Sequence, residues 1–215
     1  GNLQRLCLAQ KVASRGRVAV PMGLMAMGGY IARANEGGDG RVKRYEPTEK
    51  FVGVIEAWTN KLLQIVDVIR PADRLAQHHR LDPLFGRRMR KRGTEVMLGG
   101  WRALEPFPEV SHFIHSDAGW MLLLPVIAES VRSGAGELAP VTINLAAHAK
   151  KFGVSRSHYR RLLETAWQAG LLAQSPQNGS AILPTHELAA AFITCMASEL
   201  GHAHAWAIAT RADGS

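Results

Sequence analysis

Two stretches of this chain, far apart in the sequence, follow the same order of residue types, and this repeat constrains the fold more than any other feature. The first repeat covers residues 13–55 and the second covers residues 154–193. Each passes from a glycine into a polar loop and then into a Pro-Thr pair that precedes a new helical pattern. Two copies of one supersecondary unit explain these matches better than chance. The matching positions are Ser14-Arg15 with Ser155-Arg156, Gly29-Tyr30-Ile31 with Gly170-Leu171-Leu172, and Pro47-Thr48 with Pro184-Thr185.

The second repeat, with the residues just before it, predicts a helix, a turn and a second helix. Asn144 is a suitable N-cap for a helix over 145–152, and Gly153 tolerates the positive φ that ends a helix. Ser155 is the expected N-cap of the next helix, and Gly170 ends it. Apolar residues at 3–4 spacing predict the buried face of that helix. They are Tyr159, Leu162, Leu163, Ala166 and Trp167.

A short hairpin is expected after this second helix. Residues 171–175 and 181–184 are strand candidates around a polar tip. Thr185 then caps a last helix, with Glu187 favourably placed in its first turn. Because the tip holds Gln177 and other uncharged polar residues, we expect weak contact with DNA, or none, at this hairpin.

Polar and basic residues remain on the outer side of the second helix. Arginine binds guanine O6 and N7 bidentately, and a helix N-terminus offers free N–H groups to phosphate. These residues therefore predict a helix that lies in a DNA groove, although a solvated basic face gives the same pattern. The candidate DNA-binding residues are Ser155, Arg156, Ser157, His158, Arg160 and Arg161.

The stretch FGVSRSHYRRLLETAWQAGLL, residues 152–172, resembles the helix-turn-helix signature of bacterial winged-helix regulators, especially the GntR type. The stretch GGDGRVKRYEPTEKF, residues 37–51, is similar to the wing and following helix of MarR-type regulators. The resemblance implies binding of double-stranded DNA, with the second helix of each motif in the major groove. The chain departs from the MarR pattern by having two winged units. Its first repeat also lacks a counterpart of the helical stretch 119–131, so we expect a fragment or a missing N-terminal helix.

The first repeat is expected to contact DNA mainly through its wing. Arg41, Lys43 and Arg44 make this wing basic and suited to phosphates, although an ordinary charged hairpin is the alternative. Its helix offers only Arg15 and Arg17 before a run of apolar residues. Pro21 interrupts that run, so the helix is expected to be kinked at Pro21 or to begin there.

A long helix is predicted to start at Thr48 and to end before Pro71. It carries an apolar stripe with the spacing of a coiled-coil seam. The stripe is either internal core or a homodimer interface, and the sequence leaves both open. Its members are Phe51, Ile55, Trp58, Leu62, Ile65 and Ile69.

Three further predictions concern the segment between this helix and the second repeat. The cations of residues 87–92 surround a helix on all sides, so we expect a solvated run before a contact with DNA phosphates. Residues 101–113 contain two prolines, so we expect a loop there that separates the two halves of the chain. Ser116 or Asp117 is the expected N-cap of the helix that follows.

The composition of the chain indicates which classes of function are compatible with it. Twenty-six lysines and arginines against 18 aspartates and glutamates give a formal charge of +8, which favours a polyanionic partner. The two cysteines, Cys7 and Cys195, have no CxxC spacing, and the nine histidines lack a metal-binding arrangement. The sequence contains no Ser-His-Asp order, no phosphate loop and no dinucleotide fingerprint, so we expect no enzyme activity, no cofactor and no metal. A cytoplasmic protein without a membrane span is expected.

The expected fold is mainly α with small β-hairpin wings, in tandem winged helix-turn-helix units joined by long helices. The expected domains are residues 1–49, a helical linker or dimerisation region over 50–115, and residues 116–215. The predicted function is sequence-specific DNA binding by a transcriptional regulator, with a homodimer and an unknown small-molecule effector as further partners. The alternative is a tandem winged-helix adaptor that binds protein without reading a DNA sequence.

Overall fold

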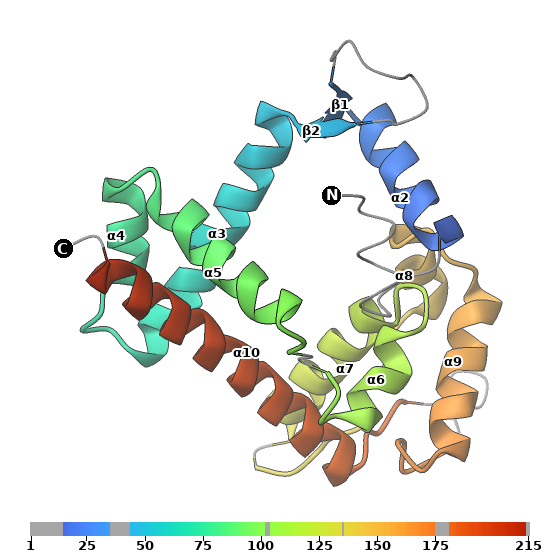
Figure 1. Ribbon diagram of the computed structural model, residues 1–215. Helices are drawn as coiled ribbons and strands as arrows, with labels where there is room; N and C mark the ends of the chain where they lie inside the picture. Colours follow the sequence, from blue (N-terminus) through green and yellow to red (C-terminus); the bar gives the residue numbers. More distant parts are fainter. Residues whose placement is uncertain (1–14, 35–43, 102–103, 135, 175–180, 214–215) are drawn as a thin grey trace. The chain divides into compact units, whose positions relative to one another are not determined.

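The computed structural model describes residues 15–34, 44–101, 104–134, 136–174 and 181–213 (Figure 1). The described fold is mainly helical with a small antiparallel hairpin, in agreement with the predicted class, whereas the second expected hairpin does not form a sheet among the described residues. The chain divides into two compact units. Unit 1 comprises residues 1–101 and 200–215, and unit 2 comprises residues 102–199. The predicted middle segment, 50–115, is thus divided between the units at residue 101, within the stretch expected to separate the halves.

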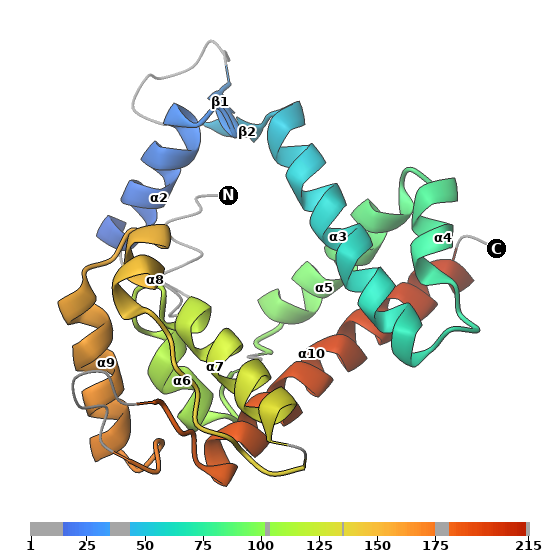
Figure 2. The same cartoon turned by 180° about the vertical axis from the view of Figure 1, so that it is seen from behind.

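The first described element of unit 1 is a helix that leads into the hairpin. Helix α2 spans Arg15–Met27, strand β1 spans Ile31–Arg33, and strand β2 spans Tyr45–Pro47 (Figure 2). The strands pair antiparallel, with Ile31 opposite Pro47 and Arg33 opposite Tyr45. Because α2 runs through Pro21, the prediction that this helix begins at the proline is wrong.

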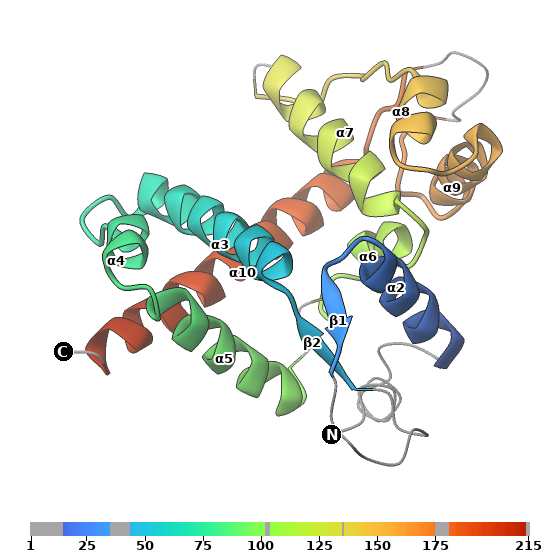
Figure 3. The ribbon, with the colours of Figure 1, turned by 90° about the horizontal axis from the view of Figure 1, so that it is seen from above.

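The rest of unit 1 is a helical cluster (Figure 3). Helix α3 spans Glu49–Ile69, α4 spans Leu75–Leu81, and α5 spans Phe85–Leu98. Helix α10, His186–Ala212, contributes its C-terminal part. The predicted limits of α3 are confirmed, with Thr48 as N-cap. The buried core joins these helices through Leu63, Val66, Leu75, Ala76, Phe85, Met89, Ala203 and Ala207.

The apolar stripe of α3 is not the core face of this helix. Its buried residues are Thr59, Leu63 and Val66, about a quarter turn away from the stripe. Trp58 is 58% exposed and Ile69 60% exposed, and Ile65 is exposed as well. Phe51, Ile55 and Leu62 are half-buried. The interpretation of the stripe as internal core is therefore wrong for its exposed half, and the spacing alone did not reveal which face meets α4, α5 and α10.

The basic run of α5 is not simply solvated. Arg90 forms an ion pair with Glu56 and donates to Thr59 Oγ1 at 2.8 Å. Arg92 pairs with Asp213 near the chain end, and Arg88 pairs with Asp82. Glu56 and Asp213 come from distant parts of the chain, whereas Asp82 lies six residues before Arg88. Arg87 is exposed, as predicted.

The described residues of unit 2 form helices α6 to α9 and the N-terminal part of α10. Helix α6 spans Pro108–Ile114, α7 spans Gly119–Ser133, α8 spans Leu145–Lys151, and α9 spans Arg156–Gln168. Its core is built mainly from α7, α9 and α10, with Leu122, Tyr159 and Leu188 fully buried. Thr185 Oγ1 accepts from Leu188 N at 3.3 Å, which confirms this residue as the predicted cap of α10.

Two local predictions for unit 2 are wrong. Part of the expected loop 101–113 is helix α6, because Pro108 occupies a first-turn position where proline is tolerated. Val110 and Phe113 bury this helix against the core. Helix α7 has no side-chain N-cap from Ser116 or Asp117. Instead the carbonyl of Ser116 accepts the Gly119 N–H at 3.0 Å, and Ala118 adopts φ 53°.

Candidate nucleic-acid interface

Helices α8 and α9 meet at the turn that the sequence predicts. Gly153 adopts φ 69°, and Val154 N–H donates to Ala149 O at 3.0 Å, which closes the end of α8. Asn144 Oδ1 accepts from Ala147 N at 3.0 Å, and Ser155 Oγ accepts from His158 N at 3.0 Å. Both predicted N-caps are confirmed. Local capping therefore fixes where each helix begins.

One face of α9 is anchored in the core of unit 2. Tyr159, Leu162, Leu163 and Ala166 are buried, as predicted. The Tyr159 hydroxyl donates to Ala118 O at 3.3 Å, and burial raises the pKa of this phenol. Trp167 departs from the prediction, since it is 39% exposed near the helix end. The remaining face of α9 points away from the core.

Exposed cations lie on that outer face and at the end of α8. Arg156, Arg160 and Arg161 are exposed on α9 together with Ser157. Residues 156 and 160 are about one helical turn apart and share one side of the helix, and residue 161 lies about 100° further round the outer surface. Lys150 and Lys151, which the sequence reasoning missed, are exposed in the last turn of α8. Their position just before the turn glycine was the available signal.

The charge of unit 2 is concentrated on this segment. Residues 102–199 contain seven lysines and arginines and eight aspartates and glutamates, so unit 2 has almost no net charge. Five of those seven cations lie within residues 150–161, which contain no acidic residue. The positive net charge of the chain thus belongs to unit 1, where Arg88, Arg90 and Arg92 are already in ion pairs.

Two of the predicted DNA-binding residues, Ser155 and His158, form hydrogen bonds within unit 2. His158 Nε2 lies 2.9 Å from Asp117 O, so its ring is held against the turn before α7. Ser155 Oγ caps α9 and lies 2.9 Å from Ser157 Oγ. These two residues position the start of α9. That any of these residues contacts DNA stays a prediction.

Two isolated backbone bridges flank the two helices among the described residues. Val141 pairs antiparallel with Ile182, and Leu172 pairs antiparallel with Pro184. In the second bridge, Ala173 N–H donates to Leu183 O at 2.9 Å. The expected strands 171–175 and 181–184 are therefore only single bridges among the described residues. Along the described residues the order is helix α7, the bridge residue Val141, helices α8 and α9, the bridge residue Leu172, and then the bridge residues Ile182 and Pro184. The tip with Gln177, Asn178 and Ser180 lies outside the described residues.

The predicted residues of the first repeat are mostly beyond what the structure describes. Arg41 and Lys43 lie outside the described residues, and Arg44 is exposed just before β2. Arg15 and Arg17 lie in the first turns of α2, where only the backbone is described. These residues belong to unit 1, whereas α9 belongs to unit 2.

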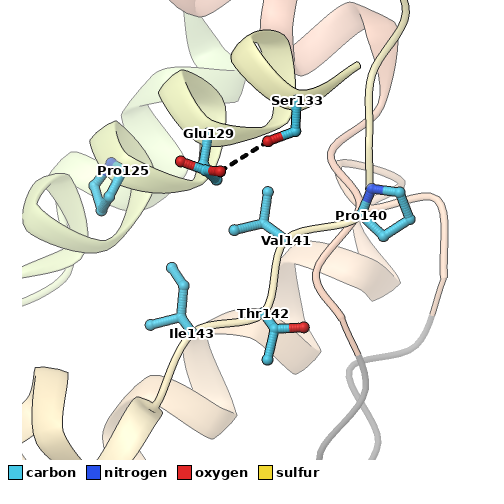
Figure 4. Close-up of a pocket in the computed structure, with 7 residues that line it drawn as sticks. All are labelled: Pro125, Glu129, Ser133, Pro140, Val141, Thr142 and Ile143. Carbon is cyan, nitrogen blue, oxygen red and sulfur yellow. Dashed lines mark hydrogen bonds between the residues drawn. The ribbon is translucent and has the colours of Figure 1, made fainter.

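A small pocket lies elsewhere in unit 2, between α7 and residues 140–143 (Figure 4). It has a volume of about 330 Å³ and is lined by Pro125, Glu129 and Ile143 among others. Glu129 accepts hydrogen bonds from Arg132 and Ser133, and these bonds lower the pKa of its carboxyl group. The carboxylate is thus already satisfied, and nothing in this pocket indicates catalysis.

Within the described residues, no group of histidine, cysteine or acidic side chains could hold a metal ion. No described helix combines the length and apolar composition that crossing a membrane needs. The chain matches no protein-family model, no curated protein and no solved structure.

Proposed function

We propose that this chain is a transcriptional regulator of the winged helix-turn-helix type, which binds double-stranded DNA sequence-specifically through the outer face of α9. The observation that carries the proposal is a helix anchored by a buried face, whose opposite face presents Arg156, Arg160 and Arg161. The order of helices and bridges in unit 2 supports it, because a winged helix-turn-helix follows the same order. A homodimer and a small-molecule effector stay predictions.

The chemistry of the outer face suits this role. Arginine pairs with guanine in the major groove and with phosphates beside it. Lys150 and Lys151 add two cations at the start of the turn, where the DNA backbone would pass. Ser155 and His158 act as positioning residues, since their hydrogen bonds fix the start of α9.

Fluorescence anisotropy with a labelled random-sequence duplex at several salt concentrations tests DNA binding. Replacing Arg156, Arg160 and Arg161 together with alanine should flatten the slope of log K against log[salt] by roughly 2–3, about 0.9 per lost phosphate contact. The matched control is Arg132→Ala, which removes an exposed cation of α7 and should leave the slope unchanged. A triple variant that binds as the parent does would contradict the assignment of α9.

Sequence specificity needs a separate measurement. Bound sites selected from a random DNA pool should converge on a motif, and Arg160→Ala should lose about 1–3 kcal/mol at that motif. Selection that yields no motif, with binding that vanishes at physiological salt, would favour the alternative function. That alternative is a winged-helix adaptor that binds protein, and one observation favours it for unit 1, namely the apolar outer face of α2.

A further inference from the structure

One line of side chains on α9 faces directly away from the core of unit 2. Its members follow one another at spacings of four, three and four residues, so they lie on one side of the helix. That side is about 180° from the buried face of α9. Three of the members are exposed and Glu164 is half-buried. This outward line consists of Ser157, Arg161, Glu164 and Gln168.

One flank of α9 is fixed by contacts with α6 and with the turn between α6 and α7. His158 Nε2 lies 2.9 Å from Asp117 O, and Thr165 Oγ1 lies 3.3 Å from His112 Nε2. The two contacts are about two helical turns apart, so they resist rotation of α9 about its axis. The opposite flank carries exposed arginines. The outward line is therefore held in one orientation, with cations along one side.

Glu164 is the acidic member of the outward line, and the nearby arginines do not neutralise it. Gln168 Nε2 donates to Glu164 Oε1 at 3.5 Å. Among the described residues the carboxylate forms no ion pair, although Arg160 and Arg161 precede it by about one helical turn. A carboxylate on a phosphate-binding surface opposes binding, because like charges repel. Glu164 therefore does not suit a surface that binds only phosphates.

The equivalent helix of unit 1 indicates that packing does not require a carboxylate at this position. Gly29 and Gly170 adopt φ 71° and 73° after α2 and α9. The residue after each glycine donates its N–H to the carbonyl five positions earlier, at 2.8 Å and 2.9 Å. With these glycines aligned, Gly23 of α2 corresponds to Glu164. The repeated backbone thus forms with no side chain at this position.

A base edge in the major groove offers the carboxylate a partner. Glutamate accepts a hydrogen bond from the N4 amino group of cytosine. Ser157 and Glu164 are separated by about 10 Å along the helix axis, which is less than the width of the major groove, about 12 Å. The serine, the arginine and the glutamate of the outward line can therefore face base edges together, while the cations beside them face phosphates.

We propose that Glu164 is a specificity-determining residue, which accepts a hydrogen bond from the N4 amino group of a cytosine in the major groove. The proposal rests on the proposed function, because it requires α9 to lie in that groove. The carboxylate acts in two ways. It favours a C·G pair at one position of the binding site, and its charge weakens binding to phosphates at every other sequence. Specificity then comes from attraction to one partner and repulsion from its competitors.

Selection of bound sites from a random DNA pool, repeated with the parent and two variants, tests the base contact. The parent motif should contain one position restricted to a C·G pair. Glu164→Gln should change the preference at that position to adenine, because glutamine binds adenine N6 and N7 bidentately. Glu164→Ala should reduce the preference for C·G there about five-fold. The other positions of the motif should stay the same in both variants.

Fluorescence anisotropy with a random-sequence duplex at low salt tests the repulsion. Both Glu164 variants should bind this duplex about two-fold more tightly than the parent, because repulsion between unit charges roughly 8 Å apart in water is removed. Their affinity for the parent's selected site should fall. The matched control is Glu105→Gln, which removes an exposed carboxylate from the turn before α6 and should change neither affinity. Circular dichroism shows whether the variants remain folded.

Two results would overturn the assignment of Glu164. One is a motif that both variants reproduce unchanged, and the other is a random-duplex affinity that does not rise in either variant. The variant that lacks Arg156, Arg160 and Arg161 separates this failure from failure of the proposed function. A parent motif that depends on these arginines but not on Glu164 removes only the assignment of Glu164. A parent that selects no motif removes the proposed function and this proposal together.

Discussion

Thr48 and Thr185 occupy equivalent places in the two units. Thr48 N–H donates to Tyr30 O at 3.0 Å, and Thr185 N–H donates to Leu171 O at 3.1 Å, in each case to the residue after the positive-φ glycine. Both side chains then cap the next helix, since their Oγ1 atoms accept from Phe51 N and Leu188 N. One threonine thus ties the start of each long helix to the end of the preceding helix.

Replacing either threonine with alanine should destabilise its own unit. We expect Thr48→Ala and Thr185→Ala each to cost about 1 kcal/mol, because the cap hydrogen bond is lost. Serine at the same positions should retain most of the stability. Urea denaturation followed by circular dichroism measures the change. Equal midpoints for the alanine and serine variants would show that the hydroxyl group does not stabilise the cap.

Sequence reasoning was most successful where structure depends on neighbours in the chain. The caps at Asn144, Ser155 and Thr185, the turn at Gly153 and the ends of α3 follow from local hydrogen bonding and backbone freedom, so the sequence predicts them. The buried face of α9 was predicted correctly except for Trp167, which lies near the helix end.

The errors concern interactions between distant segments. The spacing of the α3 stripe indicated an amphipathic helix, but it did not indicate which side of the helix is buried. The buried side carries Thr59, Leu63 and Val66, because α4, α5 and α10 pack against that side. The arginines of α5 seemed solvated because their partners, Glu56 and Asp213, are far away in sequence. In the candidate interface, the exposed arginines follow from helical spacing, whereas the contact of His158 with Asp117 depends on the α6–α7 turn.

Acid should weaken unit 2 through His148. Burial, with a smaller contribution from Lys151, lowers the pKa of this imidazole below 6.5. The ring packs against Phe152 and Tyr159, and its Nδ1 is buried without a hydrogen-bond partner among the described residues. The unfolded chain therefore takes up a proton first as the pH falls. The contribution of His148 to stability is complete above about pH 6.5 and is lost as the pH falls through the folded-state pKa.

Urea midpoints at pH 7.5 and pH 5.5, chosen on either side of the ordinary histidine pKa of about 6.5, measure this effect. The parent should lose stability at the lower pH, and His148→Gln should lose less. His186→Gln is the control, because His186 is exposed at the start of α10 and should leave the difference unchanged. An identical loss in the parent and His148→Gln would contradict a role for this histidine.

The Arg90 guanidinium should stabilise unit 1 by linking α5 to α3. It pairs with Glu56 and donates to the hydroxyl of Thr59, which is fully buried. Arg90→Met keeps the apolar stem but removes both contacts. We expect a loss of about 1–2 kcal/mol, because both charged side chains keep some exposure to solvent. The control is Arg87→Met, on the exposed side of the same helix, which should change the urea midpoint little. Equal shifts of the midpoint in the Arg90 and Arg87 variants would show that the ion pair does not stabilise unit 1.

Two glycines in helices of unit 1 should respond to alanine in opposite ways. A Cβ at Gly93 would lie 2.8 Å from the Trp206 ring, so α5 approaches α10 too closely for a side chain. Gly93→Ala should destabilise the unit by about 1–3 kcal/mol, because the tryptophan or one of the helices must move. A Cβ at Gly201 of α10 would meet nothing within 4 Å. Gly201→Ala should therefore stabilise the helix by roughly 0.5–1 kcal/mol. Thermal and urea unfolding of both variants measure these changes in stability. A stabilising effect at Gly93 would mean that Trp206 moves aside without cost, and the packing of α5 on α10 would then not depend on that glycine.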